Sequence, residues 1–250
     1  MNIDYPAQHQ MAELRALWKE AFKDEDAFLE HFYTYGFAPD RCRCVTVDGH
    51  VVAALYWFDC NFQGKPMAYL YGIATAKNHR GKGLYRALAE NTHNHLKYLG
   101  YAGEILVPAG ENLFRMYEKM GFSLCATVSE FSCQADPEPV QMQRIDVGEY
   151  RRLRREFLPE NGVLQEGDSL NFLESMADFY AGEDFLLCVS RDEKFFAPEL
   201  LGNPQAAPGI LNALHKPRGQ FRAPGAGTPF AMYYPLSDTP APEYFGLAFD

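Results

Sequence analysis

The sequence lacks the long apolar runs and the concentrated positive charge of membrane-spanning and nucleic-acid-binding proteins. Its longest unbroken apolar run, residues 51–58, has eight residues, whereas a bilayer-spanning helix needs about 20. The start of the chain lacks the basic and apolar regions of a secretory signal. Lys and Arg total 23 against 33 Asp and Glu, a formal net charge of −10, which disfavours a nucleic-acid partner. We therefore expect a cytoplasmic protein that binds neither nucleic acid nor a membrane.

Cysteine is present, but never in the spacing of a metal or redox site. The six cysteines form no CxxC pair and have no histidine cluster beside them. In strand-like surroundings a thiol behaves as a small buried apolar group. We therefore expect no bound metal and no disulfide framework. The cysteines are Cys42, Cys44, Cys60, Cys125, Cys133 and Cys188.

Hydrophobic periodicity predicts an α/β fold for the first half of the chain. Apolar residues at spacings of three and four predict helices over residues 11–22, 27–35, 84–99 and 112–120. Apolar or alternating segments predict strands over residues 43–47, 51–59, 67–75, 104–107 and 122–133. Asp48 and Gly49 suit a two-residue hairpin turn between the first two strands. This order of elements indicates an α/β (α+β) fold in which helices cover a mixed sheet.

The best candidate for a linker is residues 134–142, which hold two prolines and two acidic residues. We expect one unit over residues 1–135 and a second, smaller α/β unit over residues 136–250. Residues 44–53 align without a gap on residues 188–197, and shorter matches upstream keep the same order. These matches predict that the second unit is a degenerate copy of the first, with a hairpin at residues 188–197. The copy would lack the fourth strand and the glycine-rich segment described next.

Residues 73–88 carry the clearest chemical signal. An apolar strand runs into Arg80, Gly81, Lys82 and Gly83, and a helix follows directly. Glycines let a ligand approach the backbone, and the first turn of a helix presents unpaired N–H groups at the positive end of its dipole. The spacing is neither that of a P-loop nor Gly-x-Gly-x-x-Gly. The segment therefore favours a pyrophosphate site over the alternative, a solvated turn with two glycines.

Two motifs in the right order resemble the Gcn5-related N-acetyltransferase (GNAT) superfamily. Residues 80–84 (RGKGL) are similar to its acyl-CoA signature, Gln/Arg-x-x-Gly-x-Gly/Ala, except that Tyr85 stands at the last position. Asn112 with residues 116–122 (MYEKMGF) is similar to the family's later motif, Asn…Leu-Tyr-Glu-Lys-x-Gly-Phe. The resemblance covers residues 10–133 and implies the GNAT acyl-CoA N-acyltransferase fold for the first unit.

The resemblance also implies roles for individual residues. Backbone groups of Ile73, Ala74 and Thr75 would pair with the pantetheine arm of acetyl-CoA like an added strand. Asn112 would orient the pantetheine or the thioester. Tyr117 would protonate the departing thiolate, which suits a phenol because its pKa is near that of a thiol. The pyrophosphate would be held by the backbone amides of Arg80, Gly81, Lys82, Gly83, Leu84 and Tyr85.

The general base is not identified by the sequence. Residues 69–72 contain no carboxylate where many family members place a glutamate. Four candidates stay open: Asp59, His79, a water held by Tyr69 or Tyr71, and the carboxylate of Asp250. The last follows one branch of the family, the mycobacterial aminoglycoside-acetylating type, in which the terminal carboxylate of the chain reaches the active site.

We therefore expect an N-acetyltransferase that moves an acetyl group directly from acetyl-CoA to a primary amine of a small molecule or peptide, without a metal. The second unit would pack on the first or wall its acceptor cleft through two aromatic strands, predicted over residues 229–236 and 244–250. The alternative is a non-catalytic acyl-CoA-binding sensor or regulatory module. Tyr85 and the missing strand glutamate favour that alternative, and Tyr117 disfavours it.

Overall fold

The apolar run of the first half lies in the middle of a ten-stranded mixed sheet. Along β3 (His50–Phe62), Leu55 packs in a cluster with helix α3 (Leu84–Tyr98), and the next residue, Tyr56, packs in another cluster with α1 (Met11–Phe22). Successive side chains point to opposite faces of a strand, so a strand buried on both faces is apolar throughout. The predicted mixed α/β fold is confirmed.

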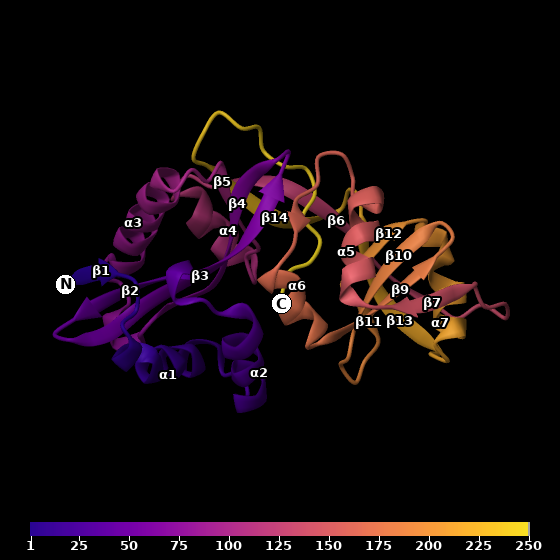
Figure 1. Cartoon of the computed structure of the whole chain (residues 1–250), viewed down its shortest axis with the longest axis horizontal. Coiled ribbons are helices and arrows are strands. Elements are labelled where there is room, and N and C mark those ends of the chain that lie inside the picture. The colour runs from indigo at the N-terminus through magenta and orange to yellow at the C-terminus, as the bar shows by residue number, and fades with distance from the viewer. Residues whose placement is uncertain (250) are drawn as a thin grey trace.

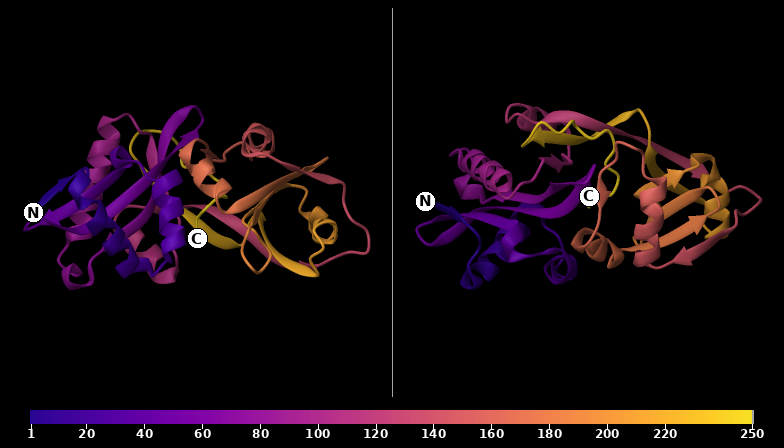
Figure 2. Two further views of the ribbon diagram at one scale, coloured as in Figure 1. Left: turned by 60° about the horizontal axis from the view of Figure 1, so that its bottom comes forward. Right: turned by 45° about the horizontal axis from the view of Figure 1, so that its top comes forward.

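The computed structural model describes residues 1–249, and Figures 1 and 2 show two lobes joined by long strands. The other strands of the larger sheet are β1 (Asn2–Asp4), β2 (Cys42–Val47), β4 (Lys65–Thr75), β5 (Gly103–Leu106), β6 (Ser123–Gln134), β8 (Leu164–Gln165), β11 (Phe196–Ala197), β13 (Arg218–Pro224) and β14 (Thr228–Pro235). The smaller sheet has β7 (Met142–Ile145), β9 (Ala177–Gly182), β10 (Phe185–Ser190) and β12 (Glu199–Gly202). The other α-helices are α2 (Asp26–His31), α4 (Glu111–Glu118), α5 (Val147–Phe157), α6 (Asp168–Glu174) and α7 (Ala207–Ala213).

The predicted helices and strands of the first half are present, with small shifts at their ends. The helix predicted over residues 27–35 is α2 followed by a π-helical turn, Phe32–Gly36. Short strands β1 and β7 were not predicted, because three or four residues show no clear period. None of the helices in residues 1–249 is long and apolar enough to cross a membrane.

Strand β14 comes from the end of the sequence but lies inside the sheet of the first lobe. It pairs antiparallel with β5 on one side and with β6 on the other. The sheet therefore runs β1-β2-β3-β4-β5-β14-β6-β13-β11, with β8 paired to β3, and both halves of the chain contribute strands to it. The expectation that this strand packs on the first half is confirmed. The division of the chain at residues 135 and 136 stays a prediction.

The second lobe has the element order of the first, apart from the two-residue strands β8 and β11, which pair with the larger sheet. Its sheet runs β12-β10-β9-β7 with antiparallel pairs throughout, as β4-β3-β2-β1 does in the first lobe. Helices α5 and α6 stand between β7 and β9, as α1 and α2 stand between β1 and β2. A duplication would produce this parallel, and it stays a prediction.

Three details of the predicted second half are wrong. Residues 188–197 form no hairpin, because β10 pairs with β9 and β12 whereas β11 pairs with β13. The fourth strand is shortened and not lost: β12 has 4 residues where β4 has 11, and α7 has 7 where α3 has 15. Residues 244–249 form no strand, although Tyr244 makes one isolated bridge to Gly162. Short sequence matches reflect composition and do not determine which strands pair.

A bulge at Gly72 marks the place where β4 leaves β5. The two strands pair in parallel only as far as Tyr69 and Ile105, and the register between β3 and β4 shifts at the same point. Gly72 has φ +60, and a Cβ there would lie 2.4 Å from Cζ3 of Trp18. Only glycine fits this backbone under the indole ring, and a bulge of this kind bends the strand.

We predict that Gly72→Ala lowers the free energy of unfolding by about 2–4 kcal/mol, because it combines a left-handed backbone with overpacking against Trp18. Gly64→Ala is the matched control, since Gly64 has φ +79 but nothing within 4 Å of a Cβ. Gly64→Ala should lower the free energy of unfolding by only about 1 kcal/mol, the cost of a left-handed backbone at alanine. Denaturant melts of both variants measure the difference. Equal losses would show that the indole contact does not constrain this strand.

Candidate active site

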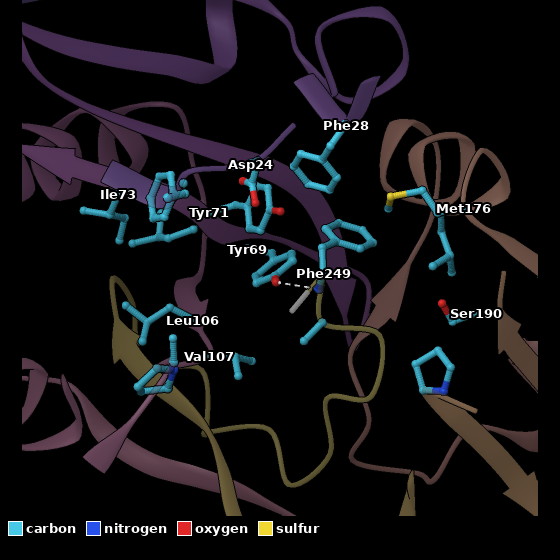
Figure 3. Close-up of a pocket in the computed structure, with 18 of the residues that line it drawn as sticks. Asp24, Phe28, Tyr69, Tyr71, Ile73, Leu106, Val107, Met176, Ser190 and Phe249 are labelled. Atoms are coloured by element: carbon cyan, nitrogen blue, oxygen red, sulfur yellow. Dashed lines mark hydrogen bonds between the residues drawn. The ribbon is translucent and has the colours of Figure 1, made fainter. Parts of the chain in front are cut away.

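The separation of β4 from β5 opens one end of a cavity of about 520 Å³. β4 continues to Thr75 after its pairing with β5 has ended, so its edge towards the opening has no strand partner in residues 1–249. Figure 3 shows Ile73 on one side of this end and Leu106 and Val107 on the other. Such an edge offers backbone N–H and C=O groups to an extended ligand.

Helix α3 begins beside this opening with a turn that contains two glycines. Gly81 and Gly83 have φ +74 and +75, and a Cβ on either would meet nothing within 4 Å, so the space around the turn is open. Gly83 is the N-cap of α3 and has no side chain to cap it, so the first N–H groups of the helix are available to a ligand. Arg80 Nε donates to the carbonyl of Thr75 at 3.0 Å, which ties the turn to the end of β4.

The electrostatics of the turn favour an anion. Residues 77–89 include four exposed basic side chains and no acidic residue. The positive end of the α3 dipole points to the same place, and the backbone amides add directional donors. The basic residues are Lys77, Arg80, Lys82 and Arg86. The arrangement suits a phosphate or pyrophosphate group.

Tyr117 is the titratable side chain that α4 contributes to the cavity. It is 7% exposed, and its ring meets that of Tyr85 edge-on, with centroids 6.2 Å apart. Burial raises the pKa of Tyr117 to about 12. Burial also raises the pKa of Tyr85, and the neighbouring Tyr117 adds to this rise. Both phenols therefore stay protonated at neutral pH.

A buried contact fixes α3 against the strands that border the opening. His93 Nδ1 of α3 lies 2.8 Å from each carboxylate oxygen of Glu104 in β5. The imidazole also stacks on Tyr234 of β14, with ring centroids 4.0 Å apart. Burial raises the pKa of Glu104, and the hydrogen bond with His93 opposes this rise. The glycine turn is thus held at a set place relative to β5.

The cavity extends from the opening to the junction of the two lobes (Figure 3). Its walls are mainly aromatic and aliphatic, with a few polar groups, as is usual for sites that bind small molecules. Helices α1 and α2 and the turn between them contribute Trp18, Phe22, Asp24 and Phe28. The second lobe contributes Leu173, Met176, Ala177, Ser190, Asp192, Phe196 and Pro198, and the tail contributes Ala248 and Phe249.

The tail, here residues 244–249, is held by a fully buried ion pair of the second lobe. Arg154 of α5 donates from Nε and Nη2 to the two oxygens of Glu199, at 2.7 and 2.9 Å. The same oxygens accept from the hydroxyls of Tyr150, at 2.7 Å, and Tyr244, at 3.0 Å. A Cβ on Gly246 would lie 2.2 Å from Glu199 Oε1. The carboxylate therefore sets where the tail passes.

Beyond this point the tail runs to the cavity. The side-chain amide of Gln165 binds both backbone groups of Leu247, donating to its oxygen at 2.6 Å and accepting from its nitrogen at 3.3 Å. The backbone nitrogen of Phe249 donates to the hydroxyl of Tyr69 at 3.3 Å (Figure 3). Its ring contacts that of Phe172, with centroids 5.1 Å apart. The second lobe thus places an aromatic wall beside β4.

The structure brings some of the predicted site residues together. Ile73 and Tyr117 line the same cavity. Ala74 and Thr75 continue along the β4 edge, and residues 80–85 form the adjoining turn and helix start. Asn112 is exposed in the first turn of α4 and is not part of the cavity wall. The roles assigned to all these residues stay predictions.

The candidate bases lie in different places. Asp59 forms an ion pair outside the cavity wall. His79 is half-buried in a short helical turn, Lys77–His79, and does not line the cavity either. Tyr69 and Tyr71, the suggested holders of a water, both line it. Asp250 lies outside the described residues.

Sequence reasoning missed the cavity walls that face away from the opening. Asp24 directly follows Lys23, the left-handed C-cap of α1, and accepts from Trp18 Nε1 at 2.8 Å. A helix end followed by a carboxylate was the available signal. No sequence signal marked Asp192, because its position at the cavity depends on how the two lobes meet. Within residues 1–249, no group of three or more His, Cys, Asp or Glu is arranged to hold a metal ion.

Comparisons with known proteins agree with this fold. A family profile described as an acetyltransferase (GNAT) domain matches residues 2–125. The chain is similar in structure to a GCN5-related N-acetyltransferase from Kribbella flavida, with TM-score 0.72 and 16% identity over 94% of this chain and 72% of that one. It is also similar to a probable N-acyltransferase from Enterococcus faecalis V583, with TM-score 0.73 and 16% identity over 94% and 72% of the two chains.

A third similar structure is Eis1 from Mycobacterium abscessus, with TM-score 0.67 and 10% identity over 94% of this chain and 74% of that one. No curated protein matches the sequence. Because these alignments cover nearly the whole chain, they show that the fold of both lobes, and not only of the first, is shared.

We predict that Glu199→Ala lowers the free energy of unfolding by about 3–5 kcal/mol, because it leaves the buried guanidinium of Arg154 without a counter-charge. Glu156→Ala is the control. It removes an exposed ion pair with Arg152 on the same helix and should change stability little. Denaturant melts compare the two, and a similar small effect of both would contradict the account. If Glu199→Ala does not fold, Tyr244→Phe removes one hydrogen bond and should cost about 1 kcal/mol.

Proposed function

Because the chain belongs to the GNAT acetyltransferase family through residues 2–125 and is an acyltransferase, we propose that it transfers an acetyl group from acetyl-CoA to a primary amine of a small molecule or peptide. The observation that carries the proposal is one continuous arrangement. The edge of β4 at Ile73 and the buried phenol of Tyr117 line one end of a cavity, the glycine turn before α3 is tied to the end of β4, and the second lobe and the tail line the other end. The cytoplasmic location expected from the sequence is part of the same proposal.

The residues of the turn and strand fit acetyl-CoA in shape and charge. The pyrophosphate would lie against the amides of residues 80–85, where open space and four cations meet. The pantetheine arm would pair with the free edge of β4 at Ile73, Ala74 and Thr75. Acetyl-CoA supplies the activated acyl group, and the backbone N–H groups of this edge would stabilise negative charge on its carbonyl oxygen.

The transfer itself is a direct displacement. The deprotonated amine nitrogen forms a bond to the acetyl carbon, the carbon–sulfur bond breaks, and its electron pair leaves on sulfur. Before attack the bound ammonium loses one proton to solvent through the base, and as the amide forms its nitrogen loses a second proton to the base. Tyr117 gives its proton to the sulfur, and transfer of a proton from the base back to Tyr117 through water restores both groups, so that charge and protons balance. A water held by Tyr69 or Tyr71 and the carboxylate of Asp250 are the bases we retain. Asp59 and His79 lie outside the cavity wall.

We predict that acetyl-CoA raises the melting temperature of the wild-type protein and of Gly100→Glu, but not of Gly83→Glu. Both glycines have positive φ and nothing within 4 Å of a Cβ, so the two variants suffer the same strain. The two substitutions lie at opposite ends of α3. Only the carboxylate at position 83 would meet the pyrophosphate. Thermal-shift titration measures this. Equal stabilisation of both variants would place the ligand elsewhere.

We predict that Tyr117→Phe lowers kcat by about 100-fold and leaves the affinity for acetyl-CoA nearly unchanged. Since the pKa of Tyr117 is about 12, the wild-type kcat should not fall between pH 7 and 9 through loss of this proton. Thiol release with a panel of amines measures both. Tyr98→Phe, on an exposed phenol of α3, is the control. Undiminished turnover by Tyr117→Phe would return Tyr117 to a packing role, and no turnover by the wild type would favour the sensor alternative.

A further inference from the structure

The charged side chains in the cavity wall are all of one sign. Asp24 and Asp192 are the only Asp or Glu residues among the described residues of the cavity wall, and no Lys, Arg or His stands among them. One carboxylate comes from the first lobe and the other from the second. The cavity therefore presents net negative charge from two sides to whatever enters it.

Asp24 is held in place without being neutralised. Trp18 Nε1 donates to its Oδ2 at 2.8 Å, and no described residue binds its Oδ1 or forms an ion pair with it. The residue is half-buried, and Figure 3 shows it at the cavity together with Phe28 and Tyr71. A carboxylate that has lost part of its water and has no counter-charge is stabilised by a cationic ligand.

Asp192 likewise has no ion-pair partner among residues 1–249. Its Oδ2 accepts from the hydroxyl of Ser190. The neighbouring Arg191 is engaged elsewhere, since it binds Asp178 at 2.9 Å and the carbonyl of Ser175 at 3.2 Å. The second lobe thus offers a hydrogen-bonded carboxylate to the cavity and directs its nearest guanidinium to other partners.

The surface between the two carboxylates is aromatic. Rings from three parts of the chain meet there, among them Phe28, Tyr69, Tyr71 and Phe249. Phe249 contacts Tyr69 and Tyr71 with ring centroids 5.6 Å away in each case. Aromatic faces attract cations and bury apolar groups, but they leave hydroxyl groups of a ligand without hydrogen bonds.

From these three features we propose that the acceptor is a primary amine on an apolar, ring-bearing body without an acidic group, and that Asp24 and Asp192 select it by its positive charge. This inference rests on the proposed function, because it assigns the acceptor side of the same cavity. An acceptor with its own carboxylate would meet two like charges there, and a small hydrophilic amine would leave the aromatic surface uncovered.

Two matched pairs of acceptors test the two halves of the inference. L-Phenylalanine amide and L-phenylalanine differ in the carboxylate, and phenethylamine and ethylamine differ in the ring. We expect kcat/KM to be higher for the first member of each pair by about 10- to 100-fold, mainly through KM. Calorimetric titration of the CoA-loaded protein with the same four amines gives the binding preference independently of turnover.

The variant Asp24→Asn with Asp192→Asn tests the carboxylates. Asparagine keeps a side-chain oxygen that can accept the hydrogen bonds from Trp18 and Ser190, but it removes the negative charge. The preference for the amide over the acid should therefore fall by about 10-fold or more, while the preference for the ring remains. Asp26→Asn is the control. Asp26 lies two residues from Asp24 but pairs with Lys19 and is not part of the cavity wall, so both preferences should be unchanged.

The outcomes separate this inference from the proposed function. If L-phenylalanine or ethylamine is bound and acetylated as well as its partner, the inference is overturned although acetyl transfer stands. An unchanged preference in the double variant overturns the role of the two carboxylates. If acetyl-CoA does not bind and no amine is acetylated, the proposed function fails. In that case calorimetric titration of the protein without CoA decides whether the cavity still prefers the amide over the acid and phenethylamine over ethylamine.

Discussion

The parting of β4 and β5 beyond Tyr69 and Ile105 is the constraint on which the site depends. Two parallel strands that remain hydrogen-bonded leave no edge for a ligand and no space between them. Here the bulge at Gly72, packed under Trp18, turns β4 away, while β14 and the His93–Glu104 contact keep β5 in place. The opening lies beside the first turn of α3, so an unpaired strand edge and a helix N-terminus face the same space.

The second half of the chain completes this arrangement. Its strand β14 closes the sheet between β5 and β6. Its buried pair of Arg154 and Glu199 directs the tail so that Phe249 reaches Tyr69. The second lobe therefore supplies both a structural strand and the far wall of the cavity. In this account the first lobe provides the acyl-donor side, and the acceptor side is shared by the two lobes.

Much of the first lobe could be predicted from the sequence, because its signals are local. The period of apolar residues places α1 and α3, and the apolar run along β3 follows from burial on both faces. The glycine turn before α3 is also readable, since positive φ at Gly81 and Gly83 requires that residue type.

The rest depends on contacts between distant parts of the chain. Nothing in residues 228–235 indicates that they pair with β5 and β6 rather than with their neighbours in sequence. The alignment of residues 44–53 with residues 188–197 predicted a hairpin that does not form, because strand pairing follows the packing of the whole lobe. Asp24 and Asp192 belong to one cavity only once the lobes have met, so the sequence alone did not link them.

Hydrogen–deuterium exchange with and without acetyl-CoA tests the central claim most directly. The account predicts slowed exchange at the amides of Ile73–Thr75 and of residues 81–86, the edge of β4 and the start of α3, which would lie against the ligand. Amides of the second-lobe sheet, such as those of β9 and β10, should be unaffected. Slowed exchange confined to the second lobe, or none at the β4 edge and the α3 start under saturating acetyl-CoA, would contradict it.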